Sequence, residues 1–329
     1  MRPPSIFLSI CTPTASPAGQ GLMRDALTRN DRRKAMKKDI YQDITNSIIE
    51  ALERVNSDDF KAPFAQLAGQ ALPLNPMTGN AYRGINTVVL WFAQFKAGYS
   101  SGEWGTYKQW QEKGAQVKKN EKSTTIIYYQ LVEKKDVNKK EKEQDFYNML
   151  KYYSVFNADQ VENYQPEIKE ETRILGNVET IKEIDTFVEK TKAVIIENQS
   201  TPCFIPSLDQ IHMVSKEIFF EDEKHSATDN YYAILFHELT HWSGGKTRLN
   251  RKQSALHNDF KAYAFEELIA ELGSAFLCAQ FKIKQEGRED HAQYIKTWLQ
   301  ALKSDKKYIF QAAAQAQKAN DFLNKTHHT

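Results

Sequence analysis

The chain has 329 residues, 41% of them hydrophobic and 26% charged, which is enough apolar material for about two domains with their own cores. A formal net charge of +2 excludes a strongly acidic or strongly basic protein, and no stretch approaches the 18 consecutive apolar residues of a membrane span. The three cysteines, Cys11, Cys203 and Cys278, lack C-x-x-C spacing and therefore favour a reducing, cytoplasmic compartment over a disulfide scaffold.

Charge is unevenly distributed along the chain. Basic residues outnumber acidic ones by 6 to 2 in residues 1–35 and by 13 to 10 in residues 36–135, whereas residues 136–329 carry 25 basic and 30 acidic residues. A mildly basic front half suits an anionic partner. The apolar stretch Ser5–Cys11 is short and is not followed by an A-x-A cleavage site, so we expect residues 1–35 to be a disordered leader, translated from upstream of a natural start near Met36.

The front half begins with an amphipathic pattern. Apolar residues at helical spacing predict a helix over residues 40–55, with one stripe formed by Ile40, Ile44, Ile48, Leu52 and Val55. Residues 74–86 are dense in turn formers, and Ser123–Tyr129 has the composition of a strand.

Between this turn and this strand, residues 95–122 interleave aromatic side chains with lysines. Single-strand nucleic-acid binders use this composition, because bases stack on aromatic rings and lysines follow the phosphates. A second interpretation is equally simple: Trp104 and Trp110 are core residues and the lysines form a solvated face. Composition alone favours this second interpretation.

The rear half is separated from the front by residues 162–178, which lack periodicity and contain Pro166, so we expect a linker there. Residues 134–142 are a charged run that we expect to be a surface loop. Residues 206–214 have the alternating character of a strand, which we expect to lie next to the helix predicted for residues 233–242.

The segment Ala233–Trp242 contains the motif H-E-x-x-H. His237 and His241 are four residues apart, so on an α-helix both imidazoles project from one face and can hold one zinc ion. Glu238 lies one step round the helix, where it could polarise a water molecule beside the metal. The alternative is a core helix whose histidines are satisfied by hydrogen bonds. His212 and His257 lack motif spacing and are expected to be ordinary surface or loop histidines.

A third ligand is expected on the helical pattern of residues 263–278, because a catalytic zinc normally has three protein ligands. This segment carries Glu266, Glu267 and Glu271 among apolar residues, and buried carboxylates are costly unless paired or metal-bound. Glu267 and Glu271 share a helix face, so one could ligate the metal while the other orients a histidine. Glu266 is expected on a solvated face. Residues 294–302 and 308–323 predict two closing helices.

The arrangement E-E-x-x-A-E at residues 266–271 resembles the N-E-x-x-S-D segment of the gluzincin metallopeptidases. The resemblance implies that Glu267 ligates zinc and that Glu271 supports a histidine. The longer side chain of Glu271, in place of the family's Asp, alters the geometry of that support.

A second resemblance covers nearly all of residues 36–323. The motifs N-P-x-T-G-x-x-Y-R-G-I-N (75–86), W-x-T-x-x-Q-W (104–110), K-K-x-E-K (118–122) and F-N-A-D-Q (156–160) resemble the N-terminal domain of ArdC-type antirestriction proteins, which also opens TraC-type plasmid primases. H-E-L-T-H-W (237–242), R-L-N-R (248–251) and Y-A-F-E-E-L-I-A-E-L-G-S (263–274) resemble the zincin-like domain of the same proteins.

This resemblance implies an α+β protein with a single-strand DNA-binding domain over residues 36–161 and a gluzincin-like metallopeptidase domain over residues 179–329. Its implied role is to protect incoming single-stranded DNA of a mobile element from host restriction, by cleaving a protein that the sequence does not identify. The expected DNA-binding side chains are Arg83, Trp104, Trp110, Lys118, Lys119 and Lys122.

Two other functions remain open on the sequence. One is a DNA-shielding protein with a structural or vestigial zinc site, and the other is a zincin-fold regulator without proteolysis. Glu238 beside a complete ligand set favours the peptidase, because structural zinc needs no adjacent base. Tyr263, one turn before Glu267, is a packing residue or a donor to the transition state.

Overall fold

The computed structural model describes residues 39–54, 71–133, 146–165, 178, 181–219, 226–251, 259–284 and 292–327. The expected leader, the charged run at residues 134–142, His257 and most of the expected linker therefore lie outside the described residues.

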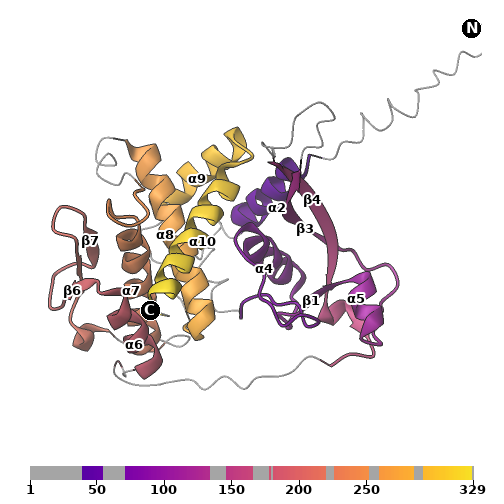
Figure 1. Cartoon of the computed structure of the whole chain (residues 1–329), viewed down its shortest axis with the longest axis horizontal. Helices are drawn as coiled ribbons and strands as arrows, with labels where there is room; N and C mark the ends of the chain where they lie inside the picture. Colours follow the sequence, from indigo (N-terminus) through magenta and orange to yellow (C-terminus); the bar gives the residue numbers. More distant parts are fainter. Residues whose placement is uncertain are drawn as a thin grey trace, which may run out of the picture. The chain divides into compact units, whose positions relative to one another are not determined.

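The front domain is built on an antiparallel sheet with the strand order β1-β4-β3 (Figure 1). Strands β3 and β4 form a long ribbon whose register runs from Thr124 opposite Val155 to Glu133 opposite Phe146. The side chain of Asn86 bonds the backbone N–H and C=O of Ile127, which fixes the start of helix α4 at the β3 edge. These elements are α2 (Ile40–Arg54), α4 (Ile85–Ala97), β1 (Trp104–Thr106), β3 (Thr124–Glu133) and β4 (Phe146–Asn157).

A small subdomain surrounds Trp110. Its elements are α5 (Tyr107–Glu112), β2 (Gln116–Val117), η1 (Ala158–Gln160) and β5 (Val161–Glu162). Strand β2 pairs with β5, and Tyr164 packs edge-on against Trp110 while its hydroxyl donates to Glu103 over 2.8 Å. The contacts of this subdomain therefore extend to Tyr164.

The rear domain places a small mixed sheet beside a set of helices. The sheet has the order β6-β8-β7, so β8 is its central strand. The predicted strand over residues 206–214 is only partly correct, because residues 206–209 form a turn and only Gln210–His212 pair. The elements are α6 (Lys182–Thr191), β6 (Val194–Ile196), β7 (Cys203–Ile205), β8 (Gln210–His212), η2 (Lys216–Ile218), α7 (Ala227–Ser243), α8 (Phe260–Phe281), α9 (Ala292–Ser304) and α10 (Tyr308–His327).

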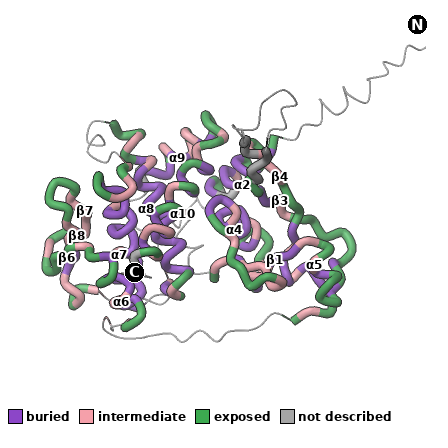
Figure 2. Tube along the Cα trace, viewed as in Figure 1, coloured by how far each residue is buried: buried purple, intermediate pink, exposed green. Residues whose placement is uncertain are grey.

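Helix α8 lies at the centre of the rear domain. It contacts α7, α9 and α10, and its buried residues run from Ala264 to Ala279 with a single partly exposed position, Phe265 (Figure 2). Close approach of α8 to α7 depends on Gly273, since a Cβ there would lie 2.5 Å from Cγ2 of Thr240. The apolar core is continuous from α2 and α4 to the rear helices, and Thr45 Oγ1 donates to the Lys306 carbonyl over 2.9 Å.

The expected α+β class is confirmed, as are the helix at the front and both closing helices. The first helix is described over Ile40–Arg54, and Val55 lies outside the described residues. Helices α9 and α10 extend slightly beyond the ranges predicted for them. Among the described helices, none combines the length and the apolar character that crossing a membrane requires.

Candidate metal centre

Helix α7 turns both motif histidines toward α8. The helix starts at a capping box in which Ser226 accepts from the Asp229 N–H and Asp229 bonds back to the Ser226 N–H, and it ends at Gly244. The Nε2 atoms of His237 and His241 face each other at 3.1 Å, and the two side chains are only 3% and 12% exposed. Apolar neighbours hold α7 in the core, so the imidazoles have little rotational freedom.

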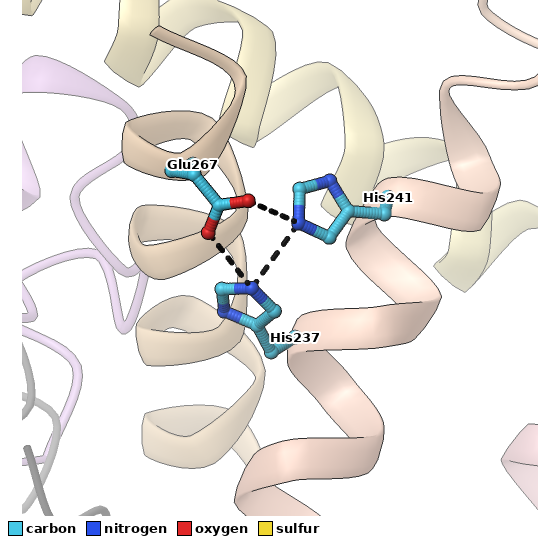
Figure 3. A group of neighbouring side chains, drawn as sticks. All are labelled: His237, His241 and Glu267. Atoms are coloured by element: carbon cyan, nitrogen blue, oxygen red, sulfur yellow. Dashed lines mark hydrogen bonds and ion pairs between the residues drawn. The ribbon is translucent and has the colours of Figure 1, made fainter. Parts of the chain in front are cut away.

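Helix α8 contributes Glu267 to the same point. One carboxylate oxygen of Glu267 lies 3.5 Å from Nε2 of His237 and the other lies 3.6 Å from Nε2 of His241 (Figure 3). Burial opposes ionisation of Glu267, but its hydrogen bond with His237 and the charge of His241 outweigh burial and lower its pKa to about 2. Glu267 is therefore an ionised carboxylate at neutral pH.

The three side chains fit a divalent metal. Their ligand atoms all lie within 4.8 Å of one another. A tetrahedral ion with bonds of about 2.0–2.1 Å keeps its ligand atoms about 3.3 Å apart. The two Nε2 atoms are 3.1 Å apart, and the two oxygens of Glu267 approach one imidazole each, at 3.5 and 3.6 Å. Two imidazoles and one carboxylate leave the fourth position open, as in catalytic zinc sites.

Glu271 supports His237 from the far side of the ring. Its Oε1 lies 3.0 Å from Nδ1 of His237, and its side chain is 1% exposed. A carboxylate at Nδ1 keeps the proton on that nitrogen, so the lone pair of Nε2 points at the metal position. The extra methylene of glutamate does not prevent this contact.

Glu266, which the sequence led us to expect on a solvated face, is buried and supports the other histidine. That expectation is wrong: the residue is 4% exposed, and its Oε1 lies 3.2 Å from Nδ1 of His241. Arg251 donates to the same carboxylate from Nε at 3.0 Å and from its terminal nitrogen at 2.8 Å. Burial opposes ionisation of Glu266, but the bonds from His241 and Arg251 outweigh it and lower its pKa to about 2. Each motif histidine thus has its own carboxyl group at Nδ1.

Glu238 is buried beside the sheet, with 3% of its surface exposed. Its charge reaches Cys203 on β7, whose thiol pKa is raised by burial and then by Glu238. Strand β7 is therefore the edge strand near the motif helix, in place of the segment at residues 206–214 that the sequence suggested.

Tyr263 lies one turn before Glu267 on α8 and is 36% exposed. Burial raises the pKa of its phenol, and the charge of Glu267 and a hydrogen bond with that carboxylate raise it further. Its phenol is thus in contact with the Glu267 carboxylate.

The predicted DNA-binding residues of the front domain divide into two groups. Trp104 and Trp110 are both 0% exposed, and Nε1 of Trp110 donates to the Phe156 carbonyl over 3.0 Å. The prediction that these two indoles stack on bases is therefore wrong, because neither ring face is accessible; both belong to the core. Trp110 belongs to a small cluster with Val117 of β2 and Val161 of β5.

The charged candidates lie on the surface. Lys118, Lys119 and Lys122 are exposed in the segment between β2 and β3, and Nζ of Lys118 donates to the Asp159 carbonyl over 2.8 Å. Arg83 has a side chain that is 62% exposed and forms an ion pair with Asp321. A role for these four residues in DNA binding stays a prediction.

Two protein-family models match the chain. The N-terminal domain of anti-restriction factor ArdC matches residues 38–156, and a zincin-like metallopeptidase matches residues 182–315. With the fold and the site, these matches define a two-domain protein that carries a zincin-like metallopeptidase domain behind an ArdC-type N-terminal domain.

Relatives with the same organisation are found in bacteria and plasmids. The uncharacterized protein y4eC of Sinorhizobium fredii is 35% identical over 301 residues, which cover 89% of this chain and 94% of the relative. DNA primase TraC of Escherichia coli is 32% identical over 308 residues, but this chain spans only 27% of its length. The metal-free crystal structure of the antirestriction protein ArdC from plasmid R388 is 37% identical with a TM-score of 0.73, covering 88% of this chain and 98% of that one. The chain belongs to the ArdC family of antirestriction proteins.

The same R388 protein has also been solved with Mn(II) bound, and that structure is 38% identical with a TM-score of 0.71 and the same coverage. A divalent metal is accordingly the cofactor class that suits this family's zincin-like domain.

Proposed function

We propose that this antirestriction protein of a mobile element binds single-stranded DNA with its front domain and cleaves a protein substrate at a zinc site in its rear domain. The observation that carries the proposal is the buried set of His237, His241 and Glu267 with Glu238 on the same helix as the histidines. We further propose that it acts in the cytoplasm, where incoming DNA meets host restriction.

The chemistry at the site depends on a bound metal. Zinc held by His237, His241 and Glu267 would act as a Lewis acid that polarises the scissile carbonyl of a peptide. A purely structural zinc would be closed by a fourth protein ligand, usually Cys or His. In the described part of the chain the grouped ligands are three, which supports a site open to substrate.

The residues of the chain have separate tasks in this mechanism. Glu238 accepts a proton from the attacking water and returns it to the leaving amine, a role that suits a carboxylate next to the ligands. Glu271 and Glu266 hold His237 and His241 in the tautomer that directs Nε2 inward. Tyr263, whose phenol contacts Glu267, is placed to donate a hydrogen bond to charge that develops on the substrate.

DNA binding is proposed for the front domain. Its match to the ArdC N-terminal domain, and the similarity of the whole chain to part of a DNA primase, support an interaction with DNA. Exposed lysines at positions 118, 119 and 122 would meet phosphates, so that affinity falls with salt.

A direct experiment separates the two activities. Wild-type and Glu238→Gln proteins are expressed in a restricting host, and newly formed protein N-termini are compared by mass spectrometry. New termini that appear with wild type and are absent with Glu238→Gln support proteolysis, provided that both purified proteins bind a labelled oligonucleotide equally. If the two proteins give identical termini, the protein acts as a DNA shield without proteolysis.

A further inference from the structure

The β3–β4 ribbon carries exposed tyrosines on the front domain. Tyr128, Tyr129, Tyr152 and Tyr153 are 59%, 48%, 61% and 44% exposed. Tyrosine side chains are usually at least half-buried in a folded domain. Four exposed tyrosine rings on two adjacent strands are therefore an unusual surface feature. Figure 2 shows exposed positions along this ribbon beside α2 and α4, which carry buried positions.

The strand register sorts these rings into two faces. Tyr128 on β3 is opposite Lys151 on β4. Tyr153, two residues after Lys151 on β4, is opposite Ile126 on β3. Opposite residues of an antiparallel pair lie on the same face and successive residues alternate, so Tyr128, Lys151 and Tyr153 share one face. The diagonal between the two tyrosines is about 7–8 Å, with the lysine beside both. Tyr129 and Tyr152 lie on the opposite face.

The rings of Tyr128 and Tyr153 are available for a ligand. Within the described part of the chain, neither forms a hydrogen bond or a ring contact, whereas Tyr129 is bonded to the Tyr41 hydroxyl over 2.8 Å. Lys151 is the only charged residue in the ribbon segments 124–129 and 149–157, and no carboxylate lies there. Within these two segments the face therefore offers two aromatic rings and one cation, and no acidic group that would repel a polyanion.

We propose that Tyr128, Lys151 and Tyr153 form a base-stacking site for single-stranded nucleic acid. Unpaired bases can stack on exposed rings regardless of sequence, and a lysine between two rings can contact the phosphate that joins the two bases. Duplex DNA hides its base faces, so the site discriminates against it. This inference rests on the proposed DNA-binding function and assigns to the ribbon the stacking role that the buried Trp104 and Trp110 do not fill.

The test uses the full chain and a fluorescent 20-nucleotide oligothymidylate, with anisotropy as the readout. Tyr128→Ala/Tyr153→Ala should weaken binding by about tenfold or more, since each stacked base contributes at least a several-fold gain in affinity. The double Phe variant should bind close to wild type, because stacking needs the ring and not the hydroxyl. Lys151→Gln should lower the slope of log affinity against log salt by about 0.7.

Tyr152→Ala is the matched control, since Tyr152 lies on the same strand, is similarly exposed and faces the other way. Its binding should equal that of wild type, and thermal unfolding should confirm that all variants are folded. Wild-type affinity in the double Ala variant, or an equal loss in Tyr152→Ala, would overturn the assignment of this face while leaving DNA binding intact. Failure of the wild-type protein itself to bind the oligonucleotide would contradict the proposed function instead.

Discussion

Replacing Glu266 by Gln tests whether this residue supports a histidine or ligates the metal itself. Glu266 meets Nδ1 of His241 at 3.2 Å and the guanidinium of Arg251 at 2.8 Å. The amide keeps the size of the side chain but loses its charge, so the proton on Nδ1 is held less firmly and Nε2 becomes a poorer ligand. Removal of such a carboxylate typically lowers metal affinity about 10–100-fold. The stoichiometry of one metal per chain should survive at saturation.

The same substitution should destabilise the metal-free protein. Breaking a buried ion pair costs about 3–5 kcal/mol. Arg251 keeps two other acceptors, the Thr240 carbonyl and Ser243 Oγ, the latter at 3.0 Å. We therefore expect a loss near the lower limit, about 3 kcal/mol, in the free energy of unfolding.

Zinc competition against a chromophoric chelator and urea unfolding of the metal-free proteins measure the two effects. Glu267→Gln, which removes a proposed ligand, should lose more affinity than Glu266→Gln. Glu183→Gln, an exposed glutamate on α6, is the control and should match wild type in both assays. Stoichiometric metal in Glu267→Gln together with its loss in Glu266→Gln would show that the ligand and the supporting residue had been exchanged.

Four further substitutions test the core and the DNA-binding surface. Trp110→Ala should lower the free energy of unfolding by about 3–5 kcal/mol, because the indole is fully buried; a weaker affinity for DNA in a protein of unchanged stability would contradict its place in the core. Gly273→Ala should destabilise by about 1–3 kcal/mol, since its Cβ would meet Thr240; calorimetry with no shift in Tm would contradict the close packing of α7 on α8. Lys119→Gln and Lys122→Gln should each lower the salt slope of oligonucleotide binding by about 0.7, and unchanged slopes would remove these lysines from the interface.

The sequence could predict which candidate ligands share a helix face because helical spacing is a local property. His237 and His241 are fixed on one face by the period of the α-helix, and Glu267 and Glu271 are fixed on another helix in the same way. The structure brings the two faces together at distances that suit a metal. That step depends on tertiary packing, which the sequence indicated only through its resemblance to known families.

Glu266 was misjudged for a physical reason. A helix surrounded by other helices has no solvated face, and α8 is covered by α7, α9 and α10. The signal that could have identified Glu266 was Arg251: it provides the charge that a buried carboxylate requires, but it lies 15 residues away along the chain.

The aromatic residues of the front domain illustrate the same limit. Composition cannot distinguish a ring that packs from a ring that stacks on a ligand, and the tryptophans were the more conspicuous candidates. Trp104 and Trp110 are in the core, whereas Tyr128 and Tyr153, in a segment predicted only as a strand, are exposed. Burial at those positions is decided by α4, α5 and the pairing of β3 with β4, all of which are non-local.

The most direct test of the account is protection of transferred DNA in a restricting host by the Glu238→Gln protein. The substitution leaves His237, His241 and Glu267 in place, so metal content, folding and oligonucleotide binding should equal those of wild type. If proteolysis carries the function, the variant should lose protection, because the base that activates water is missing. Protection equal to that of wild type would contradict this account and would show that DNA binding alone suffices.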